Sequence, residues 1–496
     1  MTVVLTGRDL DRGQLVRAAR DREPVTLDPA ARARMARTRA IVREALEHGD
    51  PVYGLSTAVG VLKRVDVPAA DAAGYASGML GHHLVGQGPD APPDVVRATL
   101  VRLANHLAEG SPGVRPELVD RILAVLDGAD TPRVRAIGSV GQADLAPLAD
   151  LAVGIAAGFD LEPGEGIALL DNNAFSTAWA TLAIADTETL LDALDVAGAL
   201  SLDGFAANPT LLHPAIGRVR PHPGIATTLA TLTDLLAGSA IHEPGVARNL
   251  QDPLSFRNLP QVHGAARDAM AHVDAVLAIE LNASQGNPIV VEDEHRVVSV
   301  ANFEILPLVA AVDYLRIVLA TALSVATERV VKSLFTPWSG LPTGLAPDGG
   351  TAHAGLTYLS LAAQSLAVEA RLLAAPVSFE LVSTAHAEGI EDRTTTAPLA
   401  ARRLAGMVEL GATIVAIELA VGAQALELRG HRAGAGTRRA LEAVRRHVPF
   451  LTMADRVPDV AGLAAAVAGG EIGRTVLGRA ALDHDRPTGP RGTAAG

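Results

Sequence analysis

The stretch from Gly138 to Leu148 reads GSVGQADLAPL and joins a short glycine-rich loop to an apolar segment. Its two glycines leave the backbone free to turn. Asp144 is a residue type whose carboxylate caps the first free N–H groups of a helix, and Pro147 falls in the first turn, where a missing N–H costs little. We therefore expect a loop over 138–143 and a helix that begins at Asp144 and is capped by it.

Outward from this stretch, apolar residues recur at three- and four-residue spacing, which predicts long amphipathic helices. A Gly at position 110 is a helix stop signal, and two short extended pieces predict a small hairpin. The fold expected is mainly all-α, a long antiparallel helical bundle with a loop-rich N-terminal region. The expected helices are 29–48, 93–110, 187–204, 263–282, 306–334, 355–375 and 401–428, and the hairpin strands are 289–292 and 296–300.

Composition supports helices, since 49% of the residues are apolar but only 3% are aromatic. A core of Leu, Val and Ala favours close-packed helices over aromatic-rich strands. We divide the chain into an N-terminal helical domain with the active-site loops (1–190) and a central and C-terminal long-helix bundle (191–484). A tail rich in Pro, Gly and Arg (485–496) is expected to be disordered.

Charge and residue types exclude several classes of function. The net charge of −13 argues against a nucleic acid or an anionic membrane as partner. Without cysteine there is neither a disulfide nor a thiolate, and no HExxH motif or close His and acid cluster suggests a metal. The most apolar stretch, 306–331, contains charged residues, among them Asp313, Arg316 and Glu328, so it predicts a buried helix and not a membrane span. We expect a soluble, cytoplasmic protein with no metal or cofactor.

Several ordered motifs between Tyr53 and Arg429 resemble the histidine and phenylalanine ammonia-lyases, the aromatic amino acid lyase family. Besides GSVG and DLAPLA they are YGLSTAVG, EGSPGVRPEL, EGIALLDNNAFSTA, LQDPLSFRNLPQVHGA, ELNASQGNPIVV, ANFEILP and IEDRTTTAP. The resemblance implies an ammonia-lyase and fumarase-like helical architecture and a homotetramer whose pockets take residues from several subunits. Because fold does not imply function, activity needs a separate argument from the site.

The departure that matters most is in the loop 138–143. There the family has Ala-Ser-Gly between GSVG and DLAPL, a tripeptide that cyclises into the electrophile methylidene-imidazolone. This chain has only Gln142-Ala143, with neither the Ser that loses water nor the Gly whose nitrogen attacks. The same tripeptide, Ala-Ser-Gly, occurs at 76–78, but it lies in an expected helix, whose backbone amides are already used in hydrogen bonds. The ring is therefore not expected, although an unfamiliar group formed at 141–143 stays an alternative.

The resemblance assigns roles to three further polar residues, Tyr53, Arg257 and Gln251. Tyr53 matches the tyrosine base of a mobile loop, or simply packs beside a Gly turn. Arg257 matches the arginine that grips the substrate carboxylate, which a planar guanidinium does with two parallel bonds; its alternative is an ion pair with Asp252. Gln251 is its polar neighbour, while Leu254 replaces a second catalytic tyrosine.

Acidic residues replace neutral ones elsewhere in the pocket that the resemblance implies. Asp171 occupies the position where the family has an asparagine, and it either binds a cationic group of the substrate or caps the following helix. Glu304 stands for a histidine and raises the same question, and Glu391 keeps the family's acidic position. Carboxylates that converge shift each other's pKa values, which separates acid and base roles. Phe303 is expected to line the pocket, and His83 either lines it or is structural.

Without the ring, removal of a proton next to an unactivated aromatic group is not feasible for a tyrosine. Backbone N–H groups of 138–143 and Arg257 remain as anion-binding groups. The sequence therefore predicts a lyase-like enzyme that catalyses elimination, addition or isomerisation on a small carboxylate-bearing, amino-acid-derived substrate. The alternative is a catalytically silent homologue that binds an amino acid or a partner protein.

Overall fold

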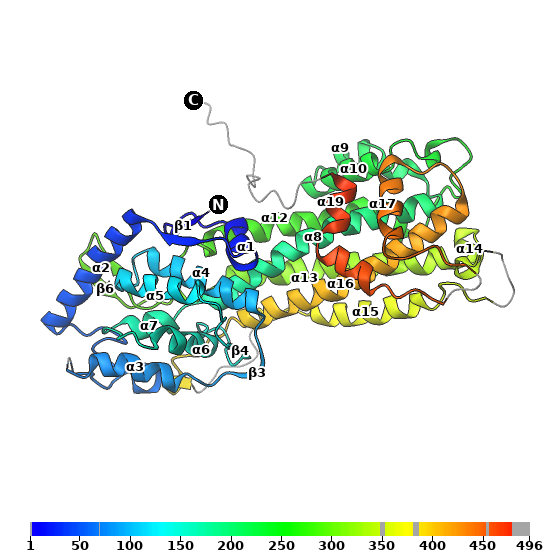
Figure 1. Ribbon diagram of the computed structural model, residues 1–496. Coiled ribbons are helices and arrows are strands. Elements are labelled where there is room, and N and C mark those ends of the chain that lie inside the picture. Colours follow the sequence, from blue (N-terminus) through cyan, green and yellow to red (C-terminus); the bar gives the residue numbers. More distant parts are fainter. Residues whose placement is uncertain (1, 69, 348–352, 380–385, 453–455, 479–496) are drawn as a thin grey trace, which may run out of the picture. The chain divides into compact units, whose positions relative to one another are not determined.

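The computed structural model describes residues 2–68, 70–347, 353–379, 386–452 and 456–478. Within these ranges the protein is mainly helical, with only three two-stranded sheets (Figure 1). This confirms the expected fold class. The expected tail, 485–496, lies outside the described residues.

The chain divides into two compact units, each assembled from three segments. Unit 1 contains residues 1–183, 274–312 and 376–402, and unit 2 contains 184–273, 313–375 and 403–496. Four long helices have residues in both units: α8 (Ala174–Phe205), α12 (Leu259–Glu280), α13 (Leu306–Leu334) and α16 (Ala397–Arg429).

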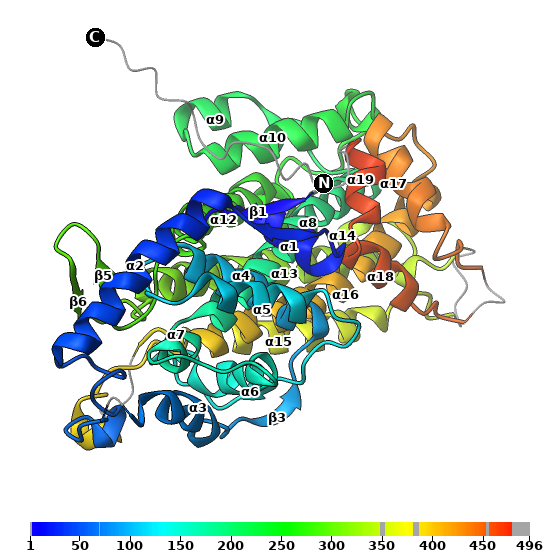
Figure 2. The ribbon, with the colours of Figure 1, turned by 60° about the vertical axis from the view of Figure 1, so that its left-hand side comes forward.

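Unit 1 holds all three sheets. Its helices α3, α6 and α7 lie side by side (Figures 1 and 2). Strands β1 and β2 pair in parallel, whereas β3–β4 and β5–β6 are antiparallel. The elements are β1 (Val3–Leu5), α1 (Arg12–Arg20), β2 (Val25–Leu27), α2 (Pro29–His48), η1 (Gly60–Leu62), α3 (Ala72–His82), β3 (Gln87–Asp90), α4 (Pro93–Ala108), α5 (Pro116–Leu126), β4 (Arg135–Ile137), α6 (Leu145–Ala156), α7 (Glu165–Leu170), β5 (Ile289–Val291), β6 (Arg296–Val298) and η5 (His386–Gly389).

Unit 2 is helical throughout its described part. Helix α17 packs against α10 and α19, and α18 packs against α19. Besides parts of the four long helices it contains η2 (Pro209–Leu212), α9 (Ala215–Val219), α10 (Pro223–Leu235), η3 (Ala240–His242), α11 (Leu254–Arg257), α14 (Thr336–Ser339), η4 (Thr343–Leu345), α15 (Leu359–Leu373), α17 (Ala435–Arg445), α18 (Ala461–Ala468) and α19 (Glu471–Leu477).

Helix α2 shows how local sequence sets the boundaries. The Asp28 carboxylate accepts hydrogen bonds from the backbone N–H groups of Ala30 and Ala31, at 2.8 and 3.0 Å, and Pro29 opens the first turn. Gly49 ends the helix in the left-handed conformation, with φ 77°. Both ends agree with the expected helix 29–48.

Among the residues that the structure describes, two helices are long and apolar enough to cross a membrane, α13 and α16. In their most apolar windows, however, 61% and 72% of the residues are buried inside the protein. A core helix of a bundle has this character, because its apolar surface is covered by other helices and not by lipid.

The expected cap of α6 is wrong in one respect. The helix begins at Leu145 and Asp144 takes the N-cap position, but its carboxylate does not bond to the first turn. It accepts instead from the backbone N–H and hydroxyl of Ser176, at 2.7 and 2.6 Å, at the start of α8. Asp144 therefore joins the beginning of α8 to the beginning of α6, a long-range contact that local pattern does not reveal.

Candidate functional site

The loop 138–143 is held by side chains on both sides. Within it, the Ser139 hydroxyl donates to the Ala143 carbonyl at 2.9 Å and accepts from the Gly141 N–H at 3.1 Å. From the segment before α16, the Thr395 hydroxyl donates to the Gly141 carbonyl at 2.9 Å. Gln142 Nε2 donates to the Glu391 carbonyl oxygen at 2.7 Å. The loop is thus tied directly to the segment that carries Glu391.

These residues do not fit a methylidene-imidazolone. The only hydroxyl within 138–143 is that of Ser139, and it is already bonded inside the loop. Gly141 has φ 85°, and a Cβ atom there would overlap the Thr395 hydroxyl, so this position demands glycine. Gln142 and Ala143 contain no group that can be dehydrated. No reaction step is therefore assigned to that ring here.

The backbone N–H groups of this loop are only partly available for an anion. Gly141 N–H is used by Ser139, and Asp144 N–H donates to the Asn172 carbonyl at 2.8 Å. The anion-binding role expected for this segment stays a prediction.

Two tyrosines hold adjacent backbone N–H groups of the loop that follows Tyr53. Tyr53 Oη accepts from Gly60 N–H and Tyr75 Oη, from α3, accepts from Val59 N–H, each at 2.9 Å. Burial raises the pKa of both phenols, and the carboxylates of Asp171 and Glu391 raise that of Tyr53 further. Tyr53 is therefore neutral at physiological pH, because burial and the nearby carboxylates both disfavour its phenolate.

Asp171 and Glu391 form an acidic pair beside Tyr53. Asp171 ends α7, and Glu391 Oε1 lies 3.8 Å from the position of a Cβ on Gly60, the residue whose N–H bonds to Tyr53. Burial first, and the Glu391 carboxylate second, raise the pKa of Asp171 to about 8. The structure thus brings three predicted residues together, and the charged form of Asp171 is disfavoured there.

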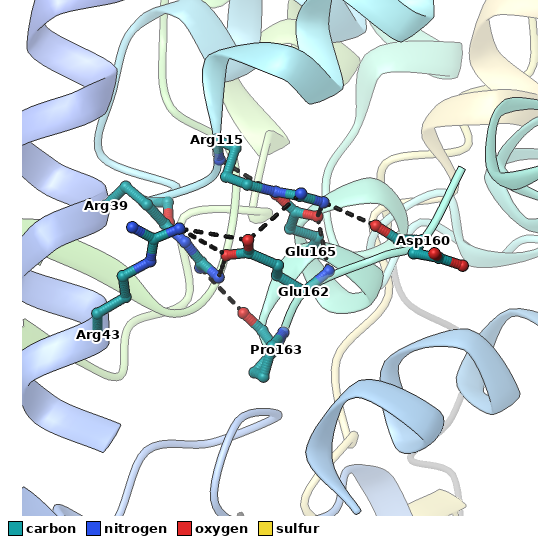
Figure 3. A network of polar contacts seen from close by, with 8 residues as sticks. Arg39, Arg43, Arg115, Asp160, Glu162, Pro163 and Glu165 are labelled. Atoms are coloured by element: carbon teal, nitrogen blue, oxygen red, sulfur yellow. Dashed lines mark hydrogen bonds and ion pairs between the residues drawn. The ribbon is translucent and has the colours of Figure 1, made fainter. Parts of the chain in front are cut away.

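The polypeptide that leads into α7 is fixed by a network of ion pairs (Figure 3). Arg115 binds both oxygens of the fully buried Glu165, with Nε–Oε1 and Nη2–Oε2 distances of 2.9 and 2.7 Å. Arg39 Nη2 lies 2.7 Å from Glu162, and Arg43 also reaches this carboxylate. Glu162 N–H in turn donates to Glu165 at 2.8 Å. We call these five side chains the clamp; it sets the position of α7, and hence of Asp171.

Glu304 and Phe303 lie at the start of α13. Glu304 Oε1 accepts from the backbone N–H of Leu306 at 2.9 Å, and its other oxygen lies 3.3 Å from Arg393 Nε. Glu304 therefore already has a helix to cap and a cation as partner. The half-buried Phe303 accepts a hydrogen bond at its carbonyl from Nδ2 of the buried Asn173.

His83 closes α3. Its Nδ1 lies 2.8 Å from the carbonyl oxygen of Met79, one turn earlier. This contact agrees with a structural histidine, and its expected pocket role stays a prediction.

Arg257 and Gln251 belong to unit 2, and both side chains are exposed. Among the described residues, Arg257 has no hydrogen-bond or ion-pair partner for its guanidinium. The alternative of an ion pair with Asp252 is not observed, since Asp252 accepts from the Asn208 N–H at 2.6 Å and from Asn249 Nδ2 at 3.1 Å. A free guanidinium is what a carboxylate-binding role requires.

Several important residues were missed from sequence. Arg102 and His106 are buried in α4, where the apolar run LVRLANHLA gave the only signal, and Arg102 Nη2 donates to the carbonyls of Glu280 and Ala283. The partners Arg115 and Glu165 lie in quoted motifs but had no assigned role. In the part of the chain that the structure describes, no group of three or more His, Asp or Glu side chains is placed to hold a metal ion.

Comparison with known proteins gives consistent relatives. The sequence profile of the aromatic amino acid lyases, described as "Aromatic amino acid lyase", matches residues 10–158 and 153–446. Histidine ammonia-lyase of Deinococcus radiodurans is 33% identical over 498 residues, 95% of this chain and 94% of that protein. Ergothionase from Treponema denticola has a TM-score of 0.90 at 26% identity, covering 95% of this chain and 99% of that one. Tyrosine aminomutase from Streptomyces globisporus has a TM-score of 0.88 at 25% identity, with coverages of 96% and 98%.

Proposed function

Because the chain belongs to the aromatic amino acid lyase family, we propose that it is an ammonia-lyase-like enzyme that works without methylidene-imidazolone. Its substrate is a small, carboxylate-bearing, amino-acid-derived molecule, and its reaction is an elimination, an addition or an isomerisation. The relatives support an amino-acid substrate, since a histidine ammonia-lyase, an ergothionase and a tyrosine aminomutase are among them. The observation that carries the proposal is the group Tyr53, Asp171 and Glu391, together with a loop whose one hydroxyl, on Ser139, is bonded within the loop.

The chemistry proposed starts from a proton on the carbon next to the substrate carboxylate. Its removal moves negative charge onto the carboxylate oxygens, and Arg257 is assigned to hold them, because a guanidinium stabilises such charge with two bonds. Glu391 is assigned to accept the proton. Tyr53, a neutral phenol, is assigned to protonate the departing group, and Asp171 to pair with a cationic group of the substrate.

The test of this proposal is turnover with a matched pair of tyrosine variants. Purified protein is incubated with a panel of amino acids and related carboxylic acids, and products are followed by absorbance of new unsaturation and by mass. We expect Tyr53→Phe to lower kcat by about 100-fold, the scale of one general acid. Tyr75→Phe removes the equivalent hydrogen bond from the neighbouring Val59 N–H, but it leaves the Tyr53 phenol beside the acidic pair intact. It should therefore retain kcat within a few fold. Full turnover by Tyr53→Phe would remove its assigned role.

Independence from the ring has a separate test. The mass of the intact protein should equal that of the unmodified chain. A mass lower by one or more water molecules would show that 141–143 or another segment cyclises, and would overturn this part of the proposal.

A catalytically silent homologue that binds an amino acid or a partner protein is the second candidate. Leu254 in place of a catalytic tyrosine, and Asp171 in place of an asparagine, are the observations that favour it. If no member of the panel is transformed while one of them binds, this candidate replaces the first.

We also propose a cytoplasmic homotetramer, the assembly that the family resemblance implies. Leu250 and Leu254, on either side of Gln251, are 85% and 62% exposed. Large exposed apolar side chains beside a functional residue are typical of an interface. Light scattering after size exclusion should give four times the mass of the 51.1 kDa chain, and a monomer would contradict the proposal.

A further inference from the structure

The segment that carries Glu391 is hydrogen-bonded to the loop 138–143 at several points. Two of these bonds end on carbonyl oxygens of the loop, from the Thr396 N–H to Val140 and from the Thr395 hydroxyl to Gly141, each at 2.9 Å. A third has its donor in the loop, since Gln142 Nε2 donates to the Glu391 carbonyl oxygen at 2.7 Å. This bond comes from a side chain of the loop, so a single substitution in the loop removes it.

The backbone of the loop sets the direction in which Gln142 extends. Its two neighbours, Gly141 and Ala143, both have positive φ, 85° and 62°. The left-handed conformation is unfavourable for Ala, and the bond from the Ser139 hydroxyl to the Ala143 carbonyl helps to hold it. Gln142 thus projects from a tight turn that is itself bonded on both sides, and its amide faces the Glu391 peptide.

The same segment has a second anchor before Glu391. Lys63 Nζ donates to the Ala387 carbonyl at 2.9 Å and lies 3.0 Å from the Glu388 carboxylate. Because this anchor does not involve Gln142, loss of the Gln142 bond should leave the segment attached to the rest of unit 1. The expected effect of such a loss is therefore local to the Glu391 peptide.

The position of Glu391 affects the groups around it. Its charge raises the pKa of Asp171 and that of Tyr53. Tyr53 is neutral at pH 7, and so is His106, which lines a cavity together with Asp171. Glu391 is therefore the charged neighbour of Asp171, and since Coulomb energy falls with distance, moving the Glu391 peptide away weakens its effect.

We propose that Gln142 is a positioning residue, which holds the Glu391 carboxylate in the acidic pair through its hydrogen bond to the Glu391 peptide. The inference rests on the proposed function in treating Glu391 as the proton acceptor. It deepens that function by giving a role to Gln142, which lies where the family has its cyclising tripeptide. In this chain the loop arranges the acids and takes no covalent part in the reaction.

An infrared titration of the full-length protein tests this without substrate. Each protein is compared with the same protein carrying Asp171→Asn, so that the difference spectrum shows the Asp171 carboxyl group. The wild type should titrate at about pH 8. Gln142→Met has a side chain of similar length that cannot donate, and its midpoint should fall by about 1 pH unit, the scale on which a nearby charge shifts a pKa. Gln142→Asn keeps the amide but is too short to reach, and should give the same fall.

Two further variants show whether the effect passes through Glu391. Glu391→Gln should itself lower the midpoint, and adding Gln142→Met to it should change nothing more, because the charge that Gln142 positions is gone. Gln87→Met is the matched control: Gln87 is an exposed glutamine of unit 1, and its Nε2 lies 3.5 Å from the Val85 carbonyl. It should leave the midpoint at about pH 8. Urea denaturation shows that each variant is folded.

A midpoint that neither Gln142→Met nor Gln142→Asn moves would overturn the inference, and so would a fall that is equally large in the Glu391→Gln background. For any substrate that is transformed, Gln142→Met should lower kcat and leave KM within a few fold. Because the titration requires no turnover, shifted midpoints in a protein that transforms nothing would count against the proposed function and not against the role of Gln142.

Discussion

Unit 1 contains two groups of carboxylates that differ in their compensation. In the clamp, Glu162 and Glu165 meet three guanidinium groups, and the pKa of Glu162 is lowered because the bonds from Arg39 and Arg43 outweigh its burial. In the acidic pair, Asp171 and Glu391 face a neutral phenol and each other, and the pKa of Asp171 rises to about 8.

Both groups contain carboxylates, and Glu165 of the clamp begins α7 while Asp171 of the acidic pair ends it. The presence of acidic residues therefore does not by itself explain why their pKa values shift in opposite directions. A carboxylate whose charge is balanced inside the protein contributes to structure. No cation is paired with Asp171 among the described residues, and its raised pKa means that its charged form costs stability, which makes it a candidate for ligand binding. We therefore assign the clamp to positioning and the acidic pair to function. Four predictions test this division.

The largest effect is expected from Glu165→Ala. This change leaves Arg115 without its bidentate partner, and breaking a buried ion pair costs about 3–5 kcal/mol. Urea denaturation at constant protein concentration measures it. Glu162→Ala is the matched control, because that carboxylate is 31% exposed and its loss should cost clearly less. Equal small losses for both variants would mean that the clamp does not hold α7.

Arg257→Ala removes a cation that has no carboxylate partner among the described residues of unit 2. We expect about a 10- to 100-fold rise in KM for the substrate carboxylate, since a bond to a charged group contributes about 1.5–3 kcal/mol. Stability should be unchanged because the side chain is exposed. Arg218→Ala, another exposed arginine of unit 2, should leave KM as it is. A loss of stability without a change in KM would assign Arg257 to structure.

Asp171→Asn should change how stability depends on pH. The folded pKa of Asp171, about 8, lies above its unfolded value of about 4, so the wild type loses stability as the pH rises from about 4 through 8. The variant lacks this loss and should gain about 1–2 kcal/mol on the wild type between pH 6 and pH 8. Asp144, whose pKa burial raises to about 7, is present in both proteins and cancels in the difference. Parallel stability curves would show that Asp171 is ionised in the folded protein.

Glu304→Gln should have the smallest effect. Its bonds to Leu306 N–H and Arg393 are partly exposed, with 34% of the side chain accessible, and such pairs contribute at most about 1 kcal/mol. We expect turnover to be retained and the melting temperature to fall slightly. A large loss of turnover would instead show that Glu304 takes part in function, although it is paired with Arg393.

The sequence predicted the fold well where periodicity was long. The bounds of α2 and α13 agree with expectation to the residue, and the hairpin β5–β6 was foreseen. Asp144 was correctly placed before a helix, but its carboxylate serves α8, because a sequence shows which side chains can cap and not which helix end is nearest in space.

The site was predictable in its residue types and not in its electrostatics. Motif resemblance selected Tyr53, Asp171 and Glu391, which the structure brings together. The different state of Glu304, which already holds Arg393, follows from contacts between segments far apart in the chain. His106 escaped notice for the same reason, since only packing buries its ring and leaves Nε2 without a hydrogen-bond partner among the described residues.

Asp171 has no cation partner among the described residues, and we expect it to stay protonated near neutral pH. Infrared difference spectra of the wild type and Asp171→Asn, recorded across a pH titration without ligand, measure this directly. We predict a protonated carboxyl band that converts to carboxylate at about pH 8 and is missing from the variant. A difference spectrum that shows Asp171 already ionised below pH 6 would contradict the account.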